Sequence, residues 1–158
     1  MSSEPFETLE AQGYPSVTQL SVFIDDRVGQ LMRLTRVFAG TDIRILGLMV
    51  VNSVDCAIVR MIVDDPDAAG RVLADHSFPY KETEMLVVCL PHGKRGLMDV
   101  WSAMLGAEID VHYTYALLGD PHGNRTIAVH TDNIEMAVES LRKDDFVVLD
   151  QMDLQMGQ

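Results

Sequence analysis

One pattern of residues occurs twice in this chain, and this internal repeat constrains the fold more than any other feature. The first part recurs at a spacing of 66 residues, with the matched pairs Leu31/Leu97, Leu34/Val100, Phe38/Met104, Gly40/Gly106, Ile43/Ile109 and Ile45/Val111. The later part recurs at a spacing of 68 residues, with the pairs Asp64/Asp132, Asp67/Glu135, Ala69/Ala137, Leu73/Leu141 and Phe78/Phe146. Such a long period predicts a duplicated domain, because the units of a solenoid are shorter and recur more often.

The repeat divides the 158 residues into two small domains. We expect a polar N-terminal arm at 1–16, a first domain at 17–84, a second domain at 85–154 and a short tail at 155–158. A domain of this size buries only a modest core on its own, so the two copies should pack on each other. No linker separates them, because Glu82-Thr83-Glu84 leads directly from the last strand of one copy into the next copy.

Hydrophobic periodicity predicts the same order of elements in each copy, which is strand, helix, strand, strand, helix, strand. In the first copy the expected elements are strands at 18–24, 43–51 and 56–63, a helix from Leu31 that ends at Gly40, a helix that begins at Pro66, and a strand from Tyr80. In the second copy they are strands at 85–90, 109–117, 125–131 and 146–154, a helix at 97–105, and a helix that Asp132 opens with Glu135 at capping-box spacing.

This order predicts an α+β fold of two tandem ferredoxin-like βαββαβ domains, each an antiparallel four-stranded sheet with its helices on one face. We expect the two domains to be paired side by side. The strand at 43–51 is apolar on both faces, with Ile45, Gly47 and Met49 on one and Leu46, Leu48 and Val50 on the other. A sheet that helices cover on one side should alternate, so a partner is expected to cover the second face or an edge.

The net charge of −12 is spread evenly over the two halves and argues against nucleic acid and anionic membranes as partners. The longest apolar run, 45–51, is far shorter than the roughly 18 residues that a membrane span needs. The N-terminus does not have the pattern of a secretion signal. Cys56 and Cys89 lie in apolar strand-like runs without metal-ligand spacing, which is typical of buried thiols in a reducing cytoplasm. We therefore expect a cytoplasmic protein.

The segments that lead into and out of the first helix of each copy carry a family resemblance. The first copy has Asp26-Arg27-Val28-Gly29-Gln30-Leu31 and then Gly40-Thr41-Asp42-Ile43, and the second has His92-Gly93-Lys94-Arg95-Gly96-Leu97 and then Gly106-Ala107-Glu108-Ile109. These segments resemble the Asn/Asp-x-Pro-Gly-x-Leu and Gly-Ile-Asn-Ile motifs of ACT domains, the amino-acid-sensing modules of metabolic enzymes. Both copies lack the proline, Arg95 replaces a glycine in the second, and Asp42 and Glu108 stand where the family has Asn.

The resemblance implies that the loops bind a small amino acid at a domain interface. A helix N-terminus favours the ligand carboxylate, Gly29 lets the backbone approach closely, and Asp25 or Asp26 could accept from the ammonium group. The expected ligand-binding residues are Asp25, Asp26, Val28, Gly29, Gln30, Leu31 and Asp42 in the first copy, and His92, Lys94, Arg95, Gly96, Leu97 and Glu108 in the second. The alternative is that Asp25-Asp26 is a solvated acidic turn and that the loop of the second copy is a solvated basic turn.

No constellation of catalytic residues emerges from the sequence. It contains no Gly-rich phosphate loop, no nucleophile elbow and no supported Cys–His pair. His92, His112 and His130 lack ligand spacing on one element, so we expect no metal and no cofactor.

The resemblance therefore implies an amino-acid-binding allosteric sensor that acts on amino-acid metabolism. We expect a homo-oligomer, most simply a dimer, and a partner metabolic enzyme. One alternative is a regulatory small subunit of a biosynthetic enzyme such as acetolactate synthase. A second is an oligomerisation module without a ligand, and a third is an enzyme on the same fold.

Overall fold

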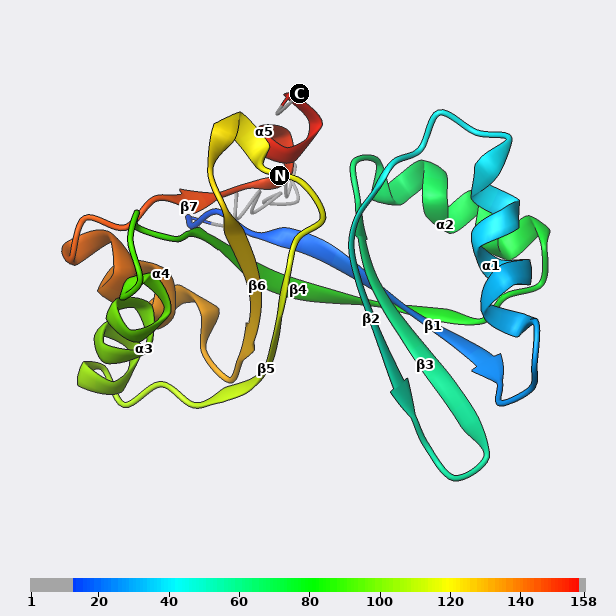
Figure 1. Cartoon of the computed structure of the whole chain (residues 1–158), viewed down its shortest axis with the longest axis horizontal. Coiled ribbons are helices and arrows are strands. Elements are labelled where there is room, and N and C mark those ends of the chain that lie inside the picture. Colours follow the sequence, from blue (N-terminus) through cyan, green and yellow to red (C-terminus); the bar gives the residue numbers. More distant parts are fainter. Residues whose placement is uncertain (1–12, 157–158) are drawn as a thin grey trace, which may run out of the picture.

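A computed structural model describes residues 13–156, so most of the predicted N-terminal arm and part of the predicted tail lie outside the described residues. In chain order the elements are β1 (Val17–Asp25), α1 (Gln30–Ala39), β2 (Ile45–Asn52), β3 (Cys56–Val63), α2 (Pro66–Asp75), β4 (Tyr80–Cys89), α3 (Gly96–Gly106), β5 (Val111–Ala116), the 3-10 turn η1 (Pro121–Gly123), β6 (Thr126–Thr131), α4 (Ile134–Lys143), β7 (Val148–Leu149) and α5 (Gln151–Met156). Helices α1 and α2 lie at one end of the molecule and α3 and α4 at the other (Figure 1).

All seven strands belong to one antiparallel sheet with the order β2-β3-β1-β4-β6-β5, and β7 also pairs with β4. The N-terminal part of β4, up to Met85, pairs with β1. Its C-terminal part, from Leu86, pairs with β6 and β7. The strand β4 is therefore the last strand of the first copy and the first strand of the second. The expectation of two separate four-stranded sheets is wrong, because Tyr80–Cys89 contains no glycine or proline that would end the strand between the copies.

Each copy has its own core between the sheet and its two helices, which confirms the tandem α+β arrangement. The first core contains Leu20, Leu34, Phe38, Val59, Met61, Ala69, Leu73 and Phe78. The second contains Leu86, Val88, Val100, Met104, Val129, Ala137 and Leu141. The residues that the repeat matched take equivalent places, since Phe38 and Met104, and likewise Leu73 and Leu141, are buried at the same point of each helix.

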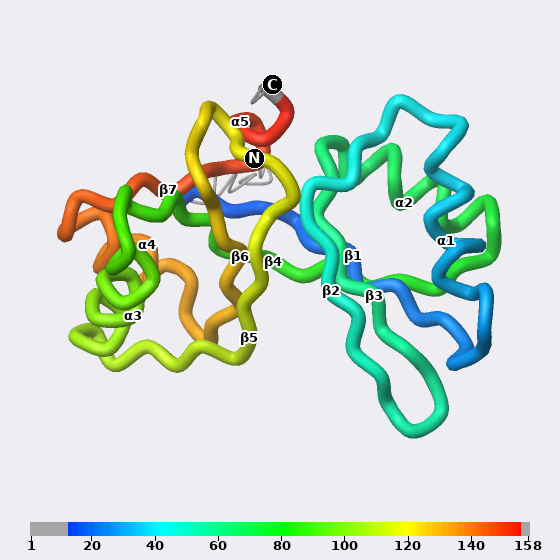
Figure 2. The backbone as a smooth tube through the Cα atoms, in the orientation of Figure 1, coloured from blue at the N-terminus to red at the C-terminus, as the bar shows by residue number. Residues whose placement is uncertain are grey.

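A third core lies between the copies, on the sheet face opposite α1 to α4, and α5 packs against it. Its buried members are Val17, Ile62, Met85, Val87, Cys89, Ala128, Leu149 and Leu154, and the half-buried Leu46, Tyr113, Tyr115 and Leu117 pack against them. We call this face the inner face. The sheet curls until its outer strands meet, where Gly47 bridges Leu117 and Leu118 N–H donates to Leu46 O at 2.6 Å (Figure 2). The cover of the second apolar face is thus the other copy of the same chain.

A β-bulge changes which side chains of β2 face the helices. The register against β3 shifts between Ile45 and Gly47, so Ile45 and Leu48 both pack on the helix side while Leu46 joins the inner core. The expected strict alternation, with Leu46 and Leu48 on one face, is wrong at this point. An extra residue in one strand reverses the facing of the residues that follow it.

The C-terminal segment differs from the predicted strand at 146–154. The strand β7 ends at Leu149, and α5 follows at once. The physical cause is a pair of reciprocal hydrogen bonds, in which Asp153 N–H donates to Asp150 Oδ1 and Asp150 N–H donates to Asp153 Oδ2, both at 2.9 Å. These bonds satisfy backbone donors at a helix start as a capping box does.

The start of α4 also differs from the prediction. This helix begins after Asn133 rather than Asp132, because the Asn133 side chain accepts from Met136 N–H.

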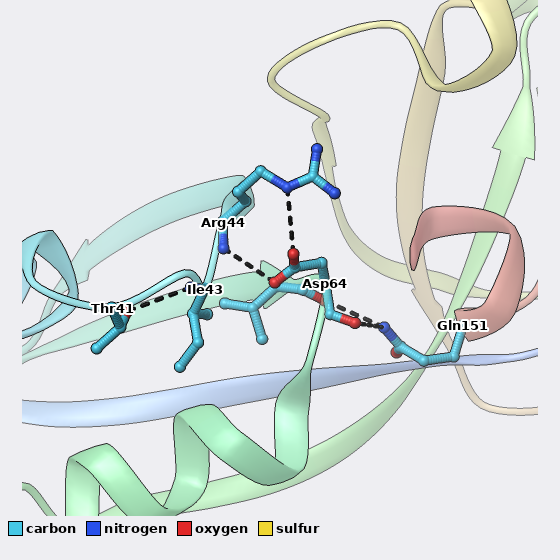
Figure 3. A network of polar contacts seen from close by, with 6 residues as sticks. Thr41, Ile43, Arg44, Asp64 and Gln151 are labelled. Carbon is cyan, nitrogen blue, oxygen red and sulfur yellow. Dashed lines mark hydrogen bonds and ion pairs between the residues drawn. The ribbon is translucent and has the colours of Figure 1, made fainter. Parts of the chain in front are cut away.

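Gln151 ties the end of the second copy to the first copy. Its Nε2 donates to Val63 O at 3.1 Å and to Asp64 O at 3.3 Å, and its Oε1 accepts from Thr18 N–H at 3.1 Å. The Asp64 carboxylate in turn accepts from the backbone N–H and the Nε of Arg44 (Figure 3). These bonds join β1, β3 and the start of β2 to α5, so they fix how the two copies are placed.

Candidate functional site

The loop between β1 and α1 holds most of the predicted site of the first copy. Gly29 precedes α1 with a φ of 88°, a left-handed conformation that glycine adopts without strain. No side chain caps this helix, and its first turn contains no acidic residue. The N-terminus of α1 therefore presents backbone N–H groups and the positive end of the helix dipole without a carboxylate from its own turn.

The side chains around this helix start are exposed. Val28 is fully exposed, Leu31 is 39% exposed, and Met32 is 60% exposed. The Asp25 carboxylate accepts from the Arg27 guanidinium at 2.6 Å, so its charge is compensated within the loop. Asp26 lies beside it, exposed, and makes no ion pair with any residue between 13 and 156. Of the two predicted acids, Asp26 is the one with a free carboxylate.

Asp42, the last predicted residue of the first copy, lies at the other end of α1. This ten-residue helix is about 15 Å long, so one copy does not bring Asp42 to Gly29. Asp42 instead lines a depression of about 610 Å³ over the start of α2, together with Thr41, Ile43, Asp64, Asp65, Ala68, Arg71, Val72 and Asp75.

The loop between β4 and α3 holds the predicted site of the second copy. Arg95 stands before the first helical residue and lies 4.0 Å from the Asp99 carboxylate. Gly96 is buried, and a Cβ there would lie 2.8 Å from Pro91 O, so a close approach of backbone requires this glycine. His92, Lys94 and Leu97 are exposed. Glu108 lies beyond the far end of α3, as Asp42 does beyond α1. The two loops lie at opposite ends of the molecule (Figure 1).

The family model for an ACT domain pair matches residues 15–156. The chain belongs to the ACT domain pair family. The structure is similar to protein BT0572 from Bacteroides thetaiotaomicron, with a TM-score of 0.81 and 24% identity over 90% of this chain and 98% of that one. No curated protein matches the sequence.

Two regulatory subunits of aspartate kinase also share the fold of this ACT domain pair. The ligand-free subunit from Thermus thermophilus has a TM-score of 0.57 and 12% identity, and the subunit from Thermus flavus has a TM-score of 0.52 and 11% identity. In both cases the match covers 82% of this chain and 92% of the other. The resemblance to tandem ACT domains that the loop motifs indicated is thus confirmed.

In this ACT domain pair, an apolar groove of about 670 Å³ lies between α3 and β5. It is lined by Met98, Trp101, Ser102, Met104, Leu105, Ile109, Asp110, Val111 and Thr114. The spacing of Met98, Trp101 and Met104 by three residues predicts a helix stripe that faces the core. Only Met104 is fully buried, whereas Trp101 is half-buried and Met98 is 58% exposed. Helical spacing identifies the stripe but does not show which of its members the sheet covers.

The inner face holds a buried polar network that local sequence patterns do not predict. Gln19 is fully buried, its Nε2 donates to the Tyr113 hydroxyl at 2.8 Å, and its Oε1 accepts from the Tyr115 hydroxyl at 2.7 Å. Burial, followed by the neighbouring Tyr113, raises the pKa of Tyr115 well above its ordinary value. The signal in the sequence was the alternation of Tyr113 and Tyr115, but their partner comes from the other copy.

The described residues offer no clear metal centre and no membrane span. Between residues 13 and 156, no group of three His, Cys, Asp or Glu side chains could hold a metal ion. None of the helices in this range is long and apolar enough to cross a membrane. Cys89 is buried, and this burial, with a smaller effect of Asp153, raises the pKa of its thiol. Such a thiol is a poor nucleophile at neutral pH.

Proposed function

We propose that this ACT domain pair is a regulatory protein that binds an amino acid and acts on amino-acid metabolism through a partner enzyme. The observation that carries the proposal is the start of α1, where Gly29, an uncapped helix N-terminus and the free Asp26 carboxylate lie together at the ligand position of the family. The fold shared with aspartate kinase regulatory subunits supports a regulatory role. The proposal assigns no catalytic role to the chain.

The chemistry of the loop fits an α-amino acid. The backbone N–H groups at the start of α1 would receive the ligand carboxylate, which the helix dipole also favours. Asp26 would accept from the ammonium group, while Val28, Gln30 and Leu31 would contact the ligand side chain. Asp25, already paired with Arg27, would hold the loop in place.

Asp42 would enter this site only from a second chain, because α1 separates it from Gly29 within one copy. We therefore propose a homodimer whose interface includes the exposed edge of β2, where Val50 is 43% and Val51 is 36% exposed. Light scattering should then give twice the monomer mass, and Asp42→Ala should weaken amino-acid binding without changing the fold.

Calorimetric titration with each of the twenty amino acids tests the proposal. We expect saturable binding of at least one of them, and Asp26→Ala should weaken it about tenfold or more, because a charge-assisted hydrogen bond is lost. The matched control is Asp55→Ala, which removes the same charge from the exposed β2–β3 turn and should leave binding unchanged. Absence of binding in every titration, or equal binding by Asp26→Ala and the wild type, contradicts the proposal.

The loop of the second copy is a weaker candidate for the same chemistry. His92, Lys94 and Arg95 would attract a carboxylate, and Gly96, Leu97 and Glu108 occupy the remaining family positions. However, Gly96 is needed for packing, and Arg95 stands where the family has a glycine. If this loop binds the ligand, Lys94→Gln should reduce the number of sites found by calorimetry, and Asp26→Ala should leave one site intact.

A ligand-free oligomerisation module is the second candidate function, and the exposed apolar groove between α3 and β5 is the observation that favours it. An oligomer whose mass and thermal stability respond to none of the twenty amino acids would support it. A regulatory small subunit of a biosynthetic enzyme such as acetolactate synthase is a variant of the first proposal. Co-purification of a large catalytic subunit with the tagged chain would identify that variant.

A further inference from the structure

Basic side chains from both copies gather on the inner face. The Arg60 guanidinium of β3 lies 4.0 Å from the centre of the Tyr113 ring of β5. That ring stacks on His130 of β6, with 4.8 Å between ring centres and 5° between planes. The Nδ1 atoms of His130 and His112 are 2.9 Å apart. A chain of contacts thus joins Arg60 of the first copy to two histidines of the second.

Lys81 belongs to the same group. Ser21 of β1 is paired with Arg60 on one side and with Lys81 on the other, so the three residues lie in register across neighbouring strands. Residues in register on adjacent strands point to the same face. Burial lowers the pKa of His130, and the nearby charges of His112, Arg60 and Lys81 lower it further. The region around His130 is therefore electropositive on a protein of net charge −12.

This group lacks the counter-charges that such a cluster normally has. Among residues 13–156, Arg60, Lys81 and His130 form no ion pair, and His112 lies 3.9 Å from the Asp110 carboxylate, which is 77% exposed. The Nε of Arg60 is buried and has no hydrogen-bond acceptor. A buried donor without an acceptor is costly, so the Arg60 side chain is held at a cost that a bound acceptor would relieve.

The group lies where the outer strands of the sheet diverge. The outer strands meet at Gly47 and Leu117 and separate from there toward the β2–β3 turn (Figure 2). Arg60 is paired with Met49, two residues past Gly47 on the side of that turn, and Lys81 and His112 are exposed. The group therefore lies beside the closure of the sheet and in contact with solvent.

We propose that Arg60, Lys81, His112 and His130 bind a small oxyanion, the phosphate or carboxylate group of a metabolite, between the two copies. Arg60 would donate two guanidinium N–H groups to the anion, since its planar fork suits bidentate recognition. Tyr113, held by Gln19, keeps the guanidinium in position. This site goes beyond the amino-acid site and does not depend on it.

Calorimetry at pH 6.0 in a buffer without phosphate tests the proposal, with inorganic phosphate and succinate as the two probes. We expect saturable binding of at least one probe, and the tighter one identifies the chemical class. Arg60→Gln should weaken binding about tenfold or more, because it removes a charge-assisted hydrogen bond to the anion. Arg36→Gln, which removes the same charge from the exposed end of α1, is the matched control and should bind as the wild type.

Two further variants keep the outcome clear. Lys81 is exposed, so Lys81→Gln should fold normally and still weaken binding, even if Arg60→Gln proves unstable. Asp26→Ala should bind phosphate or succinate as the wild type does, which separates this site from the amino-acid site. In NMR titrations the bound probe should raise the pKa of His130. Absence of saturable binding by both probes, or unchanged binding in Lys81→Gln, would overturn the proposal.

Discussion

At the residue scale, Gly47 shows how little space the closure of the sheet leaves. A Cβ at this position would lie 2.7 Å from Leu117 Cδ2 and 3.2 Å from Tyr115 Cε2. The residue also takes part in the only bridge between the outer strands among residues 13–156. Any side chain at this position must displace the inner core or open the bridge.

We therefore expect Gly47→Val to lower the free energy of unfolding by about 1–3 kcal/mol, the usual cost of overpacking a filled core. Urea unfolding, monitored by circular dichroism, measures this change in the free energy of unfolding. Gly40→Ala is the control, because a Cβ at Gly40 meets nothing within 4 Å and the φ of −93° suits alanine. Equal stability of Gly47→Val and the wild type would mean that the closure is loose.

His130 makes the stability depend on pH. Its pKa in the folded chain lies below the ordinary value of 6.5, so the unfolded chain binds this proton more tightly. Unfolding then takes up a proton at acidic pH, and the free energy of unfolding should fall as the pH decreases below 6.5. His130→Gln should flatten this part of the pH profile of the melting temperature. His92→Gln, on the exposed loop before α3, should leave the profile unchanged.

At the element scale, local pattern predicts most helices and strands but not the helix α5. The spacing of Leu31, Leu34 and Phe38 predicts α1 because it reflects one buried helix face. In contrast, Val148, Met152 and Leu154 have the even spacing of a strand, yet α5 begins at Gln151. There the hydrogen bonds between Asp150 and Asp153 decide the conformation, and hydrophobic alternation does not register such side-chain bonds.

The helix α5 places one side chain in the inner core and another in solvent, so two variants of this helix test the packing. Leu154 is 2% exposed, whereas Met152 on the same helix is 66% exposed. Leu154→Ala should cost about 2–4 kcal/mol of stability, because it leaves a cavity between the copies. Met152→Ala should change stability by less than about 0.5 kcal/mol. Thermal or urea unfolding measures both, and a similar cost for the two variants would contradict the packing described.

At the scale of the whole molecule, the two copies are built into one continuous structure. They share β4, bury a common core and are joined by the bonds of Gln151. The sequence predicts that the copies pack together, but it does not predict which faces meet. For the same reason it predicts the loops at Gly29 and Arg95, which are local, and misses the contact of Arg60 with Tyr113. That contact depends on the register of strands 53 residues apart in the sequence.

Trp101 is the only tryptophan of the chain and lies in the second copy. Its fluorescence therefore reports the unfolding of the second copy, and a variant of the first copy tests whether the two copies unfold together. We expect Leu73→Ala, a cavity in the first core, to shift the fluorescence midpoint in urea as much as the midpoint by circular dichroism. Leu141→Ala, the matched change in the second core, should behave in the same way. An unchanged fluorescence midpoint in Leu73→Ala would show that the copies unfold separately.

The shared strand β4 also restricts how this chain can change in evolution. Side chains of a strand alternate between its faces, so inserting one residue near Thr83 would reverse the facing of one copy relative to the other. Gene duplications usually leave two units that can be lost, lengthened or exchanged one at a time. Here the two units are joined inside a strand that both of them need, so neither unit can be lost or exchanged without breaking the sheet of the other.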